Sequence, residues 1–429
     1  MSLRRLAVVG VLDQFVSSGT NFLATFLIIR LGSTESFGYI ALVMSLYLLM
    51  LTISRAFTVE PTLIRGSEFR TQIRTNLPAW TSLSIGGALL LAIPPLVLCR
   101  GLLDARFTIP AIALLGASPL LLWQDTRRYQ ALASEQPYTA LRIDVAWLVL
   151  FGTSVASCAA FLRITPLEVF LCWVISGAGA GLSTELATKP PATSAQVKWV
   201  KSYLHISAPT FLDVGVAAGA AFISSIVLVY LTGSSTNGAI RASQTVFAPV
   251  SILYIGTYPA LVRLFTLPTK GSRRAMSASW VMVALNLAVG GFALAVPLSV
   301  GALVFGGSWA EIRTVLLPVT IWTTIASLPT GPLVALRALG RARTVLMWRF
   351  ITTPISLVLS AAGALRWGVF GYCLGSAAPS LPLLFGLLHA LSRGQGTPES
   401  SHNENQCDRA IGRELLPGKP LLPRNVDGP

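Results

Sequence analysis

The chain of 429 residues is 53% apolar and only 11% charged, and its formal net charge is +15. A soluble domain carries about 25% charged residues, so this composition excludes an ordinary water-soluble fold. The basic residues stand in short joints between apolar runs and not on one solvated face, which argues against nucleic acid as a partner.

Apolar runs of roughly 20 residues recur along the chain, the length that crosses a hydrocarbon core of about 30 Å. In the first half they predict membrane helices at 8–29, 39–60, 78–98, 107–126, 143–162 and 167–187. In the second half they predict helices at 206–231, 239–262, 278–303, 314–336, 345–364 and 367–391. The fold class that follows is an all-α membrane protein of about twelve transmembrane helices.

The first run follows Arg4 and Arg5, as in a signal peptide, but Asp13 and Gln14 interrupt it and no A-x-A cleavage site follows. We therefore expect a retained first membrane helix. Lysine and arginine are more frequent in the even-numbered joints, and the positive-inside bias then predicts that both termini face the cytoplasm of a bacterial inner membrane. The polar stretch 393–429 has no apolar period and is predicted to be a disordered cytoplasmic tail.

The second half repeats the first at an offset of 200 residues. The matched pairs are Leu12 with Leu212, Asp13 with Asp213, Val16 with Val216, Gly19 with Gly219, Phe22 with Phe222, Leu31 with Leu231, Gly38 with Gly238 and Ile40 with Ile240. A unit of six helices is even, so both copies enter the membrane from the same side. We expect two pseudo-symmetric six-helix lobes, at 1–200 and 201–392, with the substrate path between them.

Three short motifs carry a resemblance to a known family. Leu31-Gly32 and Phe37-Gly38 form an L-G-x5-F-G joint, Gln124-Asp125-x-x-Arg128-Tyr129 forms a Q-D-x-x-R-Y segment, and 338–343 forms an A-L-G-R-x-R turn. With these motifs the sequence resembles the multidrug/oligosaccharidyl-lipid/polysaccharide (MOP) exporter superfamily, in particular its Wzx-like polysaccharide flippases. The first helix lacks the run of arginines found in the lipid II flippases of that superfamily.

The resemblance implies two lobes in a V that open alternately to each side of the membrane. It implies a polyprenyl-diphosphate-linked oligosaccharide, or a related polysaccharide precursor, as the substrate. Membrane lipids and a coupling cation, a proton or a sodium ion, are the further partners that we expect. We expect a transporter and not an enzyme, with no cofactor. The scattered cysteines and histidines likewise predict no metal site.

Charged residues inside membrane helices cost at least about 2.5 to 3.5 kcal/mol each and usually face a cavity or a partner. Asp13 and Asp213 are matched by the repeat, and we expect them either to bind a coupling cation in a central vestibule or to stand in a first helical turn favoured by the helix dipole. Asp125 and Asp144 stand near basic residues and predict a structural ion-pair network.

Two arginines are candidates for substrate binding. Arg55 lies within the second predicted helix, where its planar fork suits a diphosphate, although its side chain could also extend to the membrane surface. Arg241 lies near the outer end of the eighth predicted helix, the end that faces away from the cytoplasm. It either binds the same anion or is an arginine at the membrane–water interface.

Two other functions remain open from the sequence. A cation-coupled multidrug exporter of the same superfamily would use Asp13 as its ion-binding carboxylate and would need an electronegative cavity. A membrane polysaccharide polymerase or glycosyltransferase would need a large extracytoplasmic loop with paired acids, whereas the outer joints here are short and carry single acids.

Overall fold

The structure, a computed structural model, describes residues 3–65, 105–133, 136–161, 163–185, 193–265 and 271–393. Within these ranges the chain forms α-helices, one short 3-10 helix and the joints between them, with no strand. The predicted helix at 78–98 and the predicted tail beyond Arg393 lie outside the described residues. The count of twelve membrane helices therefore stays a prediction.

Each predicted range that falls within the described residues overlaps a helix. The first half contains α1 (Leu3–Leu31), α2 (Thr34–Arg65), α4 (Ala105–Ala133), α5 (Pro137–Phe161) and α6 (Pro166–Glu185). The second half contains α7 (Thr193–Thr232), α8 (Ser234–Val246), α9 (Ala248–Phe265), α10 (Gly271–Ala295), α11 (Leu298–Phe305), η1 (Gly306–Ser308), α12 (Trp309–Ser327), α13 (Thr330–Ala338), α14 (Ala342–Ala377) and α15 (Ser380–Arg393). Seven of the described helical segments are long and apolar enough to cross a membrane.

Proline and glycine decide where the structure departs from the predicted ranges. The range 278–303 is divided between α10 and α11, because Pro297 cannot donate the backbone hydrogen bond that a continuous helix needs. Helix α14 contains a turn at Trp367 and Gly368, where Gly368 has φ 58°, so it joins the last two predicted ranges. Positive φ favours glycine, which has no Cβ.

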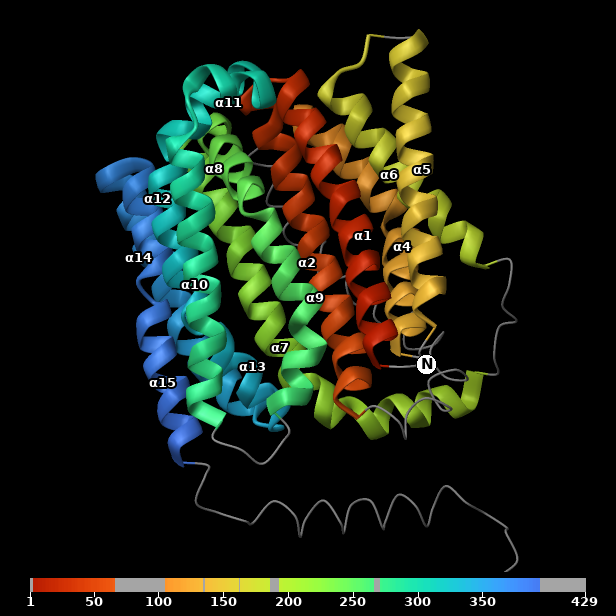
Figure 1. Ribbon diagram of the computed structural model, residues 1–429, viewed down its shortest axis with the longest axis vertical. Helices are drawn as coiled ribbons and strands as arrows, with labels where there is room; N and C mark the ends of the chain where they lie inside the picture. Colours follow the sequence, from red (N-terminus) through yellow and green to blue (C-terminus); the bar gives the residue numbers. More distant parts are fainter. Residues whose placement is uncertain are drawn as a thin grey trace, which may run out of the picture.

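Helix α7 begins 13 residues before the predicted range 206–231, at Thr193. Its first part lies across one end of the bundle in Figure 1, while the remainder runs along the other helices. A membrane span needs about 20 residues, so a helix of 40 residues cannot lie straight within the hydrocarbon core. Pro209 inside the helix supplies a cause for a bend.

The helices run roughly side by side in one bundle, with the first half on one side and the second half on the other (Figure 1). Helices α4, α5 and α6 pack against each other and against α1 and α2, whereas α10, α12, α13 and α14 form the second group. The two halves meet where α2 packs against α7 and α8 and where α1 packs against α9. We call the end that carries α11 the upper end, and the end that carries the start of α1 and α13 the lower end.

Polar contacts join the two halves at the upper end. The Arg30 guanidinium donates to the Val304 carbonyl over 2.8 Å. The Glu311 carboxylate accepts hydrogen bonds from Thr34 in the first half and from Ser235 in the second half. Hydrogen bonds thus join described residues of the two halves at the upper end, which we call the seal.

Two glycines bring the backbones together at this seal. A Cβ on Gly38 of α2 would overlap the Ser234 carbonyl oxygen, and a Cβ on Gly238 of α8 would overlap the Thr34 carbonyl oxygen. Asn237 adds a hydrogen bond of 3.1 Å to the Gly38 carbonyl. Gly38 and Gly238 are partners in the sequence repeat, so the matched glycines lie against each other's helix.

We predict that Gly38→Ala lowers the stability of the folded protein, because the added methyl group meets backbone atoms that cannot rotate away. Overpacking of this kind costs roughly 1 to 3 kcal/mol. The measurement is the melting temperature of the purified protein in detergent, and Gly19→Ala is the matched control, since a Cβ there meets nothing within 4 Å. Equal melting temperatures for the two variants would contradict the close contact.

Candidate functional site

A buried ion-pair cluster lies among α1, α4 and α5. The Arg128 guanidinium is 2.9 Å from Asp13 Oδ2 and 2.7 Å from Asp144 Oδ2. Asp13 and Asp144 are completely buried, and 3% of the Arg128 side chain is exposed. A buried charge is tolerated when it is paired and hydrogen-bonded, so Arg128 is what allows both carboxylates to stand at this depth.

Arg55 joins the same cluster through Asp125. Its Nε and Nη2 donate to the two Asp125 carboxylate oxygens over 2.8 and 2.7 Å, a bidentate pair. The guanidinium also lies over the Tyr129 ring, 4.9 Å from its centroid. The structure thus gives Arg55 a protein partner, with 30% of its side chain exposed. The ion-pair network predicted for Asp125 and Asp144 is present, and Arg128 is one of its predicted cations, whereas Arg55 of α2 is a member that the sequence did not indicate.

The Q-D-x-x-R-Y segment supplies most of this cluster. Gln124 Nε2 donates to Asp144 Oδ1 over 3.3 Å, Asp125 and Arg128 form the ion pairs, and Tyr129 lies under Arg55. The spacing suits a helix, because residues three and four apart lie on one face. One motif on α4 therefore holds α1, α2 and α5 together through charge.

A second cluster surrounds Asp213 of α7. Arg337 of α13 and Arg349 of α14 both contact this carboxylate, and the Arg349 Nε lies 3.2 Å from Asp213 Oδ1. Asp213 is 1% exposed. The matched pair Asp13 and Asp213 is therefore placed alike: each aspartate is buried inside its own half and paired with arginine. Neither aspartate is among the described residues that line the cavity of the second half, which is described below.

The two clusters differ in their charge balance. The first contains three carboxylates, of Asp13, Asp125 and Asp144, and two guanidiniums, of Arg55 and Arg128. The second contains one carboxylate and two guanidiniums. Within these described groups, the first cluster has an excess of one negative charge and the second an excess of one positive charge. The two clusters are thus matched through Asp13 and Asp213 in the sequence repeat but have opposite net charge when all their groups are ionised.

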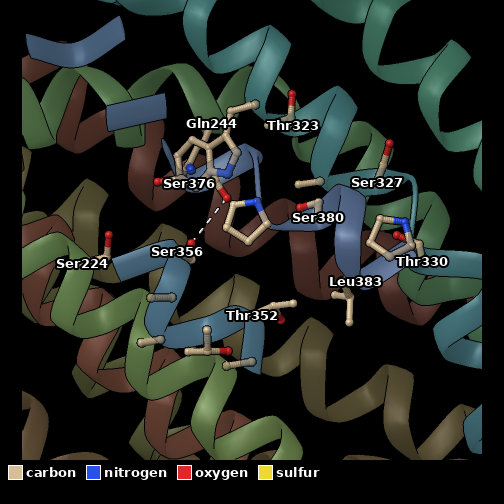
Figure 2. A pocket seen from close by; sticks show the side chains of 18 of the residues that line it. Ser224, Gln244, Thr323, Ser327, Thr330, Thr352, Ser356, Ser376, Ser380 and Leu383 are labelled. Carbon is tan, nitrogen blue, oxygen red and sulfur yellow. Dashed lines mark hydrogen bonds between the residues drawn. The ribbon is translucent and has the colours of Figure 1, made fainter. Parts of the chain in front are cut away.

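A cavity of about 610 Å³ lies inside the second half, enclosed by α7 to α10 and α12 to α15. Figure 2 shows the hydroxyl groups that line it, including those of Ser224, Thr323, Ser327, Thr330 and Ser356. Amide and aromatic side chains complete the polar lining: Gln244, Asn286, Tyr254, Trp322 and Tyr372. We expected the substrate path between the lobes, whereas the cavity among the described residues lies within one of them.

The charged residues that line the cavity are Arg241 and Arg349, and no carboxylate lines it among the described residues. Arg241 Nη1 donates to Gln244 Oε1 over 3.1 Å, and Nη2 donates to the Ser225 hydroxyl. The structure shows no ion pair between Arg241 and another described residue. Arg241 therefore stands at the cavity wall with neutral partners, which leaves its charge available to an anion.

Arg349, Gln244 and Tyr372 were not among the residues predicted from the sequence. Arg349 lies within the predicted helix 345–364. An arginine several residues inside an apolar range is the signal that could have identified it. The neutral lining residues carry no signal in the sequence, because serine and threonine are common in membrane helices.

The comparisons with known proteins agree on the architecture. No protein-family model and no curated protein matches the sequence. Among solved structures, the lipid II flippase MurJ in an inward closed conformation has a TM-score of 0.68 at 12% identity, over 90% of this chain and 87% of that one. A multidrug resistance MATE family transporter in its inward-facing conformation has a TM-score of 0.64 at 12% identity, over 91% and 99%.

A third structure, a MOP superfamily transporter from Pyrococcus furiosus described as having a binding pocket of reverse polarity, has a TM-score of 0.65 at 13% identity, over 92% and 96%. This chain has the MOP transporter fold. The predicted superfamily resemblance is confirmed at the level of fold. The MOP fold is shared by multidrug exporters and a lipid flippase, so substrate class must come from the residues of the site.

We predict that Arg128→Gln strongly destabilises the protein, because it removes the guanidinium that both Asp13 and Asp144 contact. Breaking a buried ion pair by removing one partner costs about 3 to 5 kcal/mol. The measurement is folded yield by size-exclusion chromatography together with melting temperature. Arg273→Gln, at an exposed position, is the control with the same change in charge. A stable Arg128→Gln protein would show that the cluster is not needed for folding.

Proposed function

We propose that this chain is an exporter of the bacterial inner membrane that moves an anionic, hydroxyl-rich amphiphile by alternating access. The substrate class that fits best is a polyprenyl-diphosphate-linked oligosaccharide or a related polysaccharide precursor. The observation that carries this proposal is the cavity of the second half, with two guanidiniums and no carboxylate in its described lining. The charge of the cavity is the property that separates an anionic substrate from a cationic one.

The lining has the chemistry that a phosphorylated sugar requires. Guanidinium groups bind phosphate oxygens through planar, charge-assisted hydrogen bonds. Hydroxyl and amide groups such as those of Ser224, Gln244 and Asn286 exchange hydrogen bonds with sugar hydroxyls, and the faces of Trp322 and Tyr372 offer apolar contact. A cavity of about 610 Å³ is large enough for a head group of this kind, since ligand sites occupy roughly 300 to 1,000 Å³.

We propose Arg241 as the first phosphate ligand, supported by its place in the cavity and its neutral partners. Arg349 is the second, because it lines the cavity and shares Asp213 with Arg337. Arg55, the other predicted ligand, already forms a bidentate pair with Asp125 and would have to exchange this carboxylate for the substrate. The structure therefore favours the arginines of the second half.

We propose Asp13 as a site for a coupling cation, proton or sodium. The cluster around it contains one more carboxylate than guanidiniums, so a bound cation would balance the charge. Asp13 Oδ1 accepts no hydrogen bond from a described residue, which leaves it acceptor capacity. Asp213, the other predicted coupling residue, has two arginine partners and no excess negative charge to neutralise, so its proposed role is to balance these arginines.

The alternative is a cation-coupled multidrug exporter, and the charge of the first cluster is consistent with it as well. The same coupling site would serve either transporter, so the cluster does not distinguish them. The cavity does, because Arg241 and Arg349 would repel a cationic drug. An enzyme of polysaccharide assembly is the less favoured class, because the described residues show no pair of carboxylates in the cavity for acid–base chemistry.

For orientation, the start of α1 and the end of α15 both lie at the lower end of the bundle (Figure 1). This supports the proposal that both ends of the membrane part face the cytoplasm, as the basic joints predict. The sealed upper end then faces away from the cytoplasm.

We predict that transport falls in the order wild type, Arg241→Lys, Arg241→Ala, Arg241→Glu. Lysine keeps the charge but loses the planar fork, alanine loses both, and glutamate repels the anion. A charge-assisted hydrogen bond contributes about 1.5 to 3 kcal/mol, so Arg241→Ala should weaken binding roughly 10- to 100-fold. The assay is translocation of a lipid-linked oligosaccharide in vesicles, with ethidium efflux measured in parallel.

Arg366→Ala is the control, because Arg366 is an exposed arginine outside the cavity lining. If Arg241→Glu matches the wild type at equal abundance, the anion site is not at Arg241. Ethidium export without translocation of the lipid-linked sugar would support the multidrug exporter.

We predict that Asp13→Asn abolishes the dependence of transport on an ion gradient but leaves substrate binding measurable. Asparagine keeps the shape of the side chain and removes the negative charge that would bind the cation. Asp213→Asn is the repeat-matched comparison and should keep the gradient dependence while altering affinity. Transport is measured in vesicles with and without imposed proton or sodium gradients. Unchanged coupling in Asp13→Asn would move the coupling site elsewhere.

A further inference from the structure

A second hollow, separate from the cavity, lies on the outside of the second half. It is a groove of about 660 Å³ between α7 and the first part of α14. Its apolar lining includes Pro209, Leu212, Leu346, Met347, Phe350 and Ile351. Met347 and Phe350 are 55% and 52% exposed, so the groove opens to the surroundings of the protein. In a membrane-spanning bundle such a surface faces hydrocarbon.

Among the described residues that line the groove, Arg343 is the charged one. It is the second residue of α14, which begins at the lower end, and the lining continues along this helix to Ile351. Eight residues of helix correspond to about 12 Å, so the groove runs from a cation near the membrane surface toward the interior. This is the arrangement of a lipid in one leaflet, with its head group at the surface and its chain below.

The same two helices separate the groove from the cavity. On α7, Leu212 lines the groove and Ala217 lines the cavity. On α14, Phe350 lines the groove, whereas Arg349 lines the cavity. Further along α14, Thr352 and Ser356 also line the cavity (Figure 2).

The ion pair between Asp213 and Arg349 joins α7 to α14 in this wall. A head group that passes from the groove into the cavity must part these two helices. An anionic head group can part the helices at low electrostatic cost, because its negative charge takes the place of the Asp213 carboxylate beside Arg349. The Asp213 carboxylate then remains paired with Arg337. A zwitterionic or neutral head group would leave Arg349 without this compensation.

We propose that the groove between α7 and α14 is a lateral entrance that binds a lipid whose phosphate head group carries a net negative charge. The hydrocarbon chain lies along the groove, the phosphate binds Arg343, and the head group then moves to Arg349 in the cavity. The entry route rests on the proposed function, whereas binding of the lipid in the groove does not. The substrate thus reaches the cavity from the bilayer and not from the aqueous phase.

The experiment uses the full chain in phosphatidylcholine nanodiscs. One probe is a polyprenyl monophosphate with a diazirine in its chain, and the comparison probe is phosphatidylcholine with a diazirine in one acyl chain. After illumination, labelled peptides are mapped by mass spectrometry. We expect the phosphate probe to label the segments 208–212 and 343–351 several-fold more than the choline probe does.

Two pairs of variants test the named residues. Arg343→Gln should lower labelling by the phosphate probe about fivefold, the effect of one basic residue on an anionic lipid at a membrane surface, whereas Arg366→Gln, at the other end of the same helical segment, should not. Ala208→Trp should fill the groove and exclude the probe. Ala362→Trp is its control at an exposed position of α14 outside both hollows. Size-exclusion profiles confirm that each variant is folded.

Equal labelling by the two probes, or labelling unaffected by Arg343→Gln in a folded protein, would overturn the proposal and leave an ordinary site for bulk lipid. Selective labelling without translocation of any lipid-linked sugar would support the groove and count against the proposed function. Translocation that persists in Ala208→Trp without labelling would support the function and exclude this entrance.

Discussion

The pairing of charge inside the membrane helices is the constraint on which the rest of the structure depends. Arg128 compensates Asp13 and Asp144, and Asp213 compensates Arg337 and Arg349. None of these groups could remain charged in hydrocarbon alone. Each cluster also joins helices that are distant in sequence, α1 with α4 in the first half and α7 with α13 and α14 in the second. The second cluster lies beside both hollows of its half, because Arg349 lines the cavity and Leu212, the neighbour of Asp213, lines the groove.

The two clusters have opposite charge balance, and this difference fits the roles proposed for them. An excess of carboxylate in the first cluster suits a small cation, whereas Arg241 and Arg349 in the cavity of the second half suit a phosphate. The repeat explains why Asp13 and Asp213 occupy equivalent places, and their neighbours explain why equivalent residues need not have equivalent roles. The role of each aspartate depends on the net charge of the whole cluster around it and not on the charge of the aspartate alone.

The sequence was sufficient for features that depend on local pattern. Apolar length located the helices within the described residues, and the repeat identified Asp13, Asp213, Gly38 and Gly238. It was insufficient for features made by packing between distant helices. Apart from Arg241 and Arg349, the cavity is built from neutral side chains of eight helices. Arg55 was expected near substrate because Asp125, 70 positions away, could not be recognised as its partner. Likewise, Cys158 and Cys172 showed no paired spacing, yet their sulfurs lie 3.6 Å apart.

The contact between Gly38 and Gly238 is reciprocal, because each glycine lies against the residue at the start of the other's helical segment, Ser234 or Thr34. Such reciprocity is the property of an isologous interface, in which one patch binds a second copy of itself. A unit with a single glycine at this position could pair with a second copy of itself through such a surface. The seal between the halves therefore has the form of a homodimer contact within one chain.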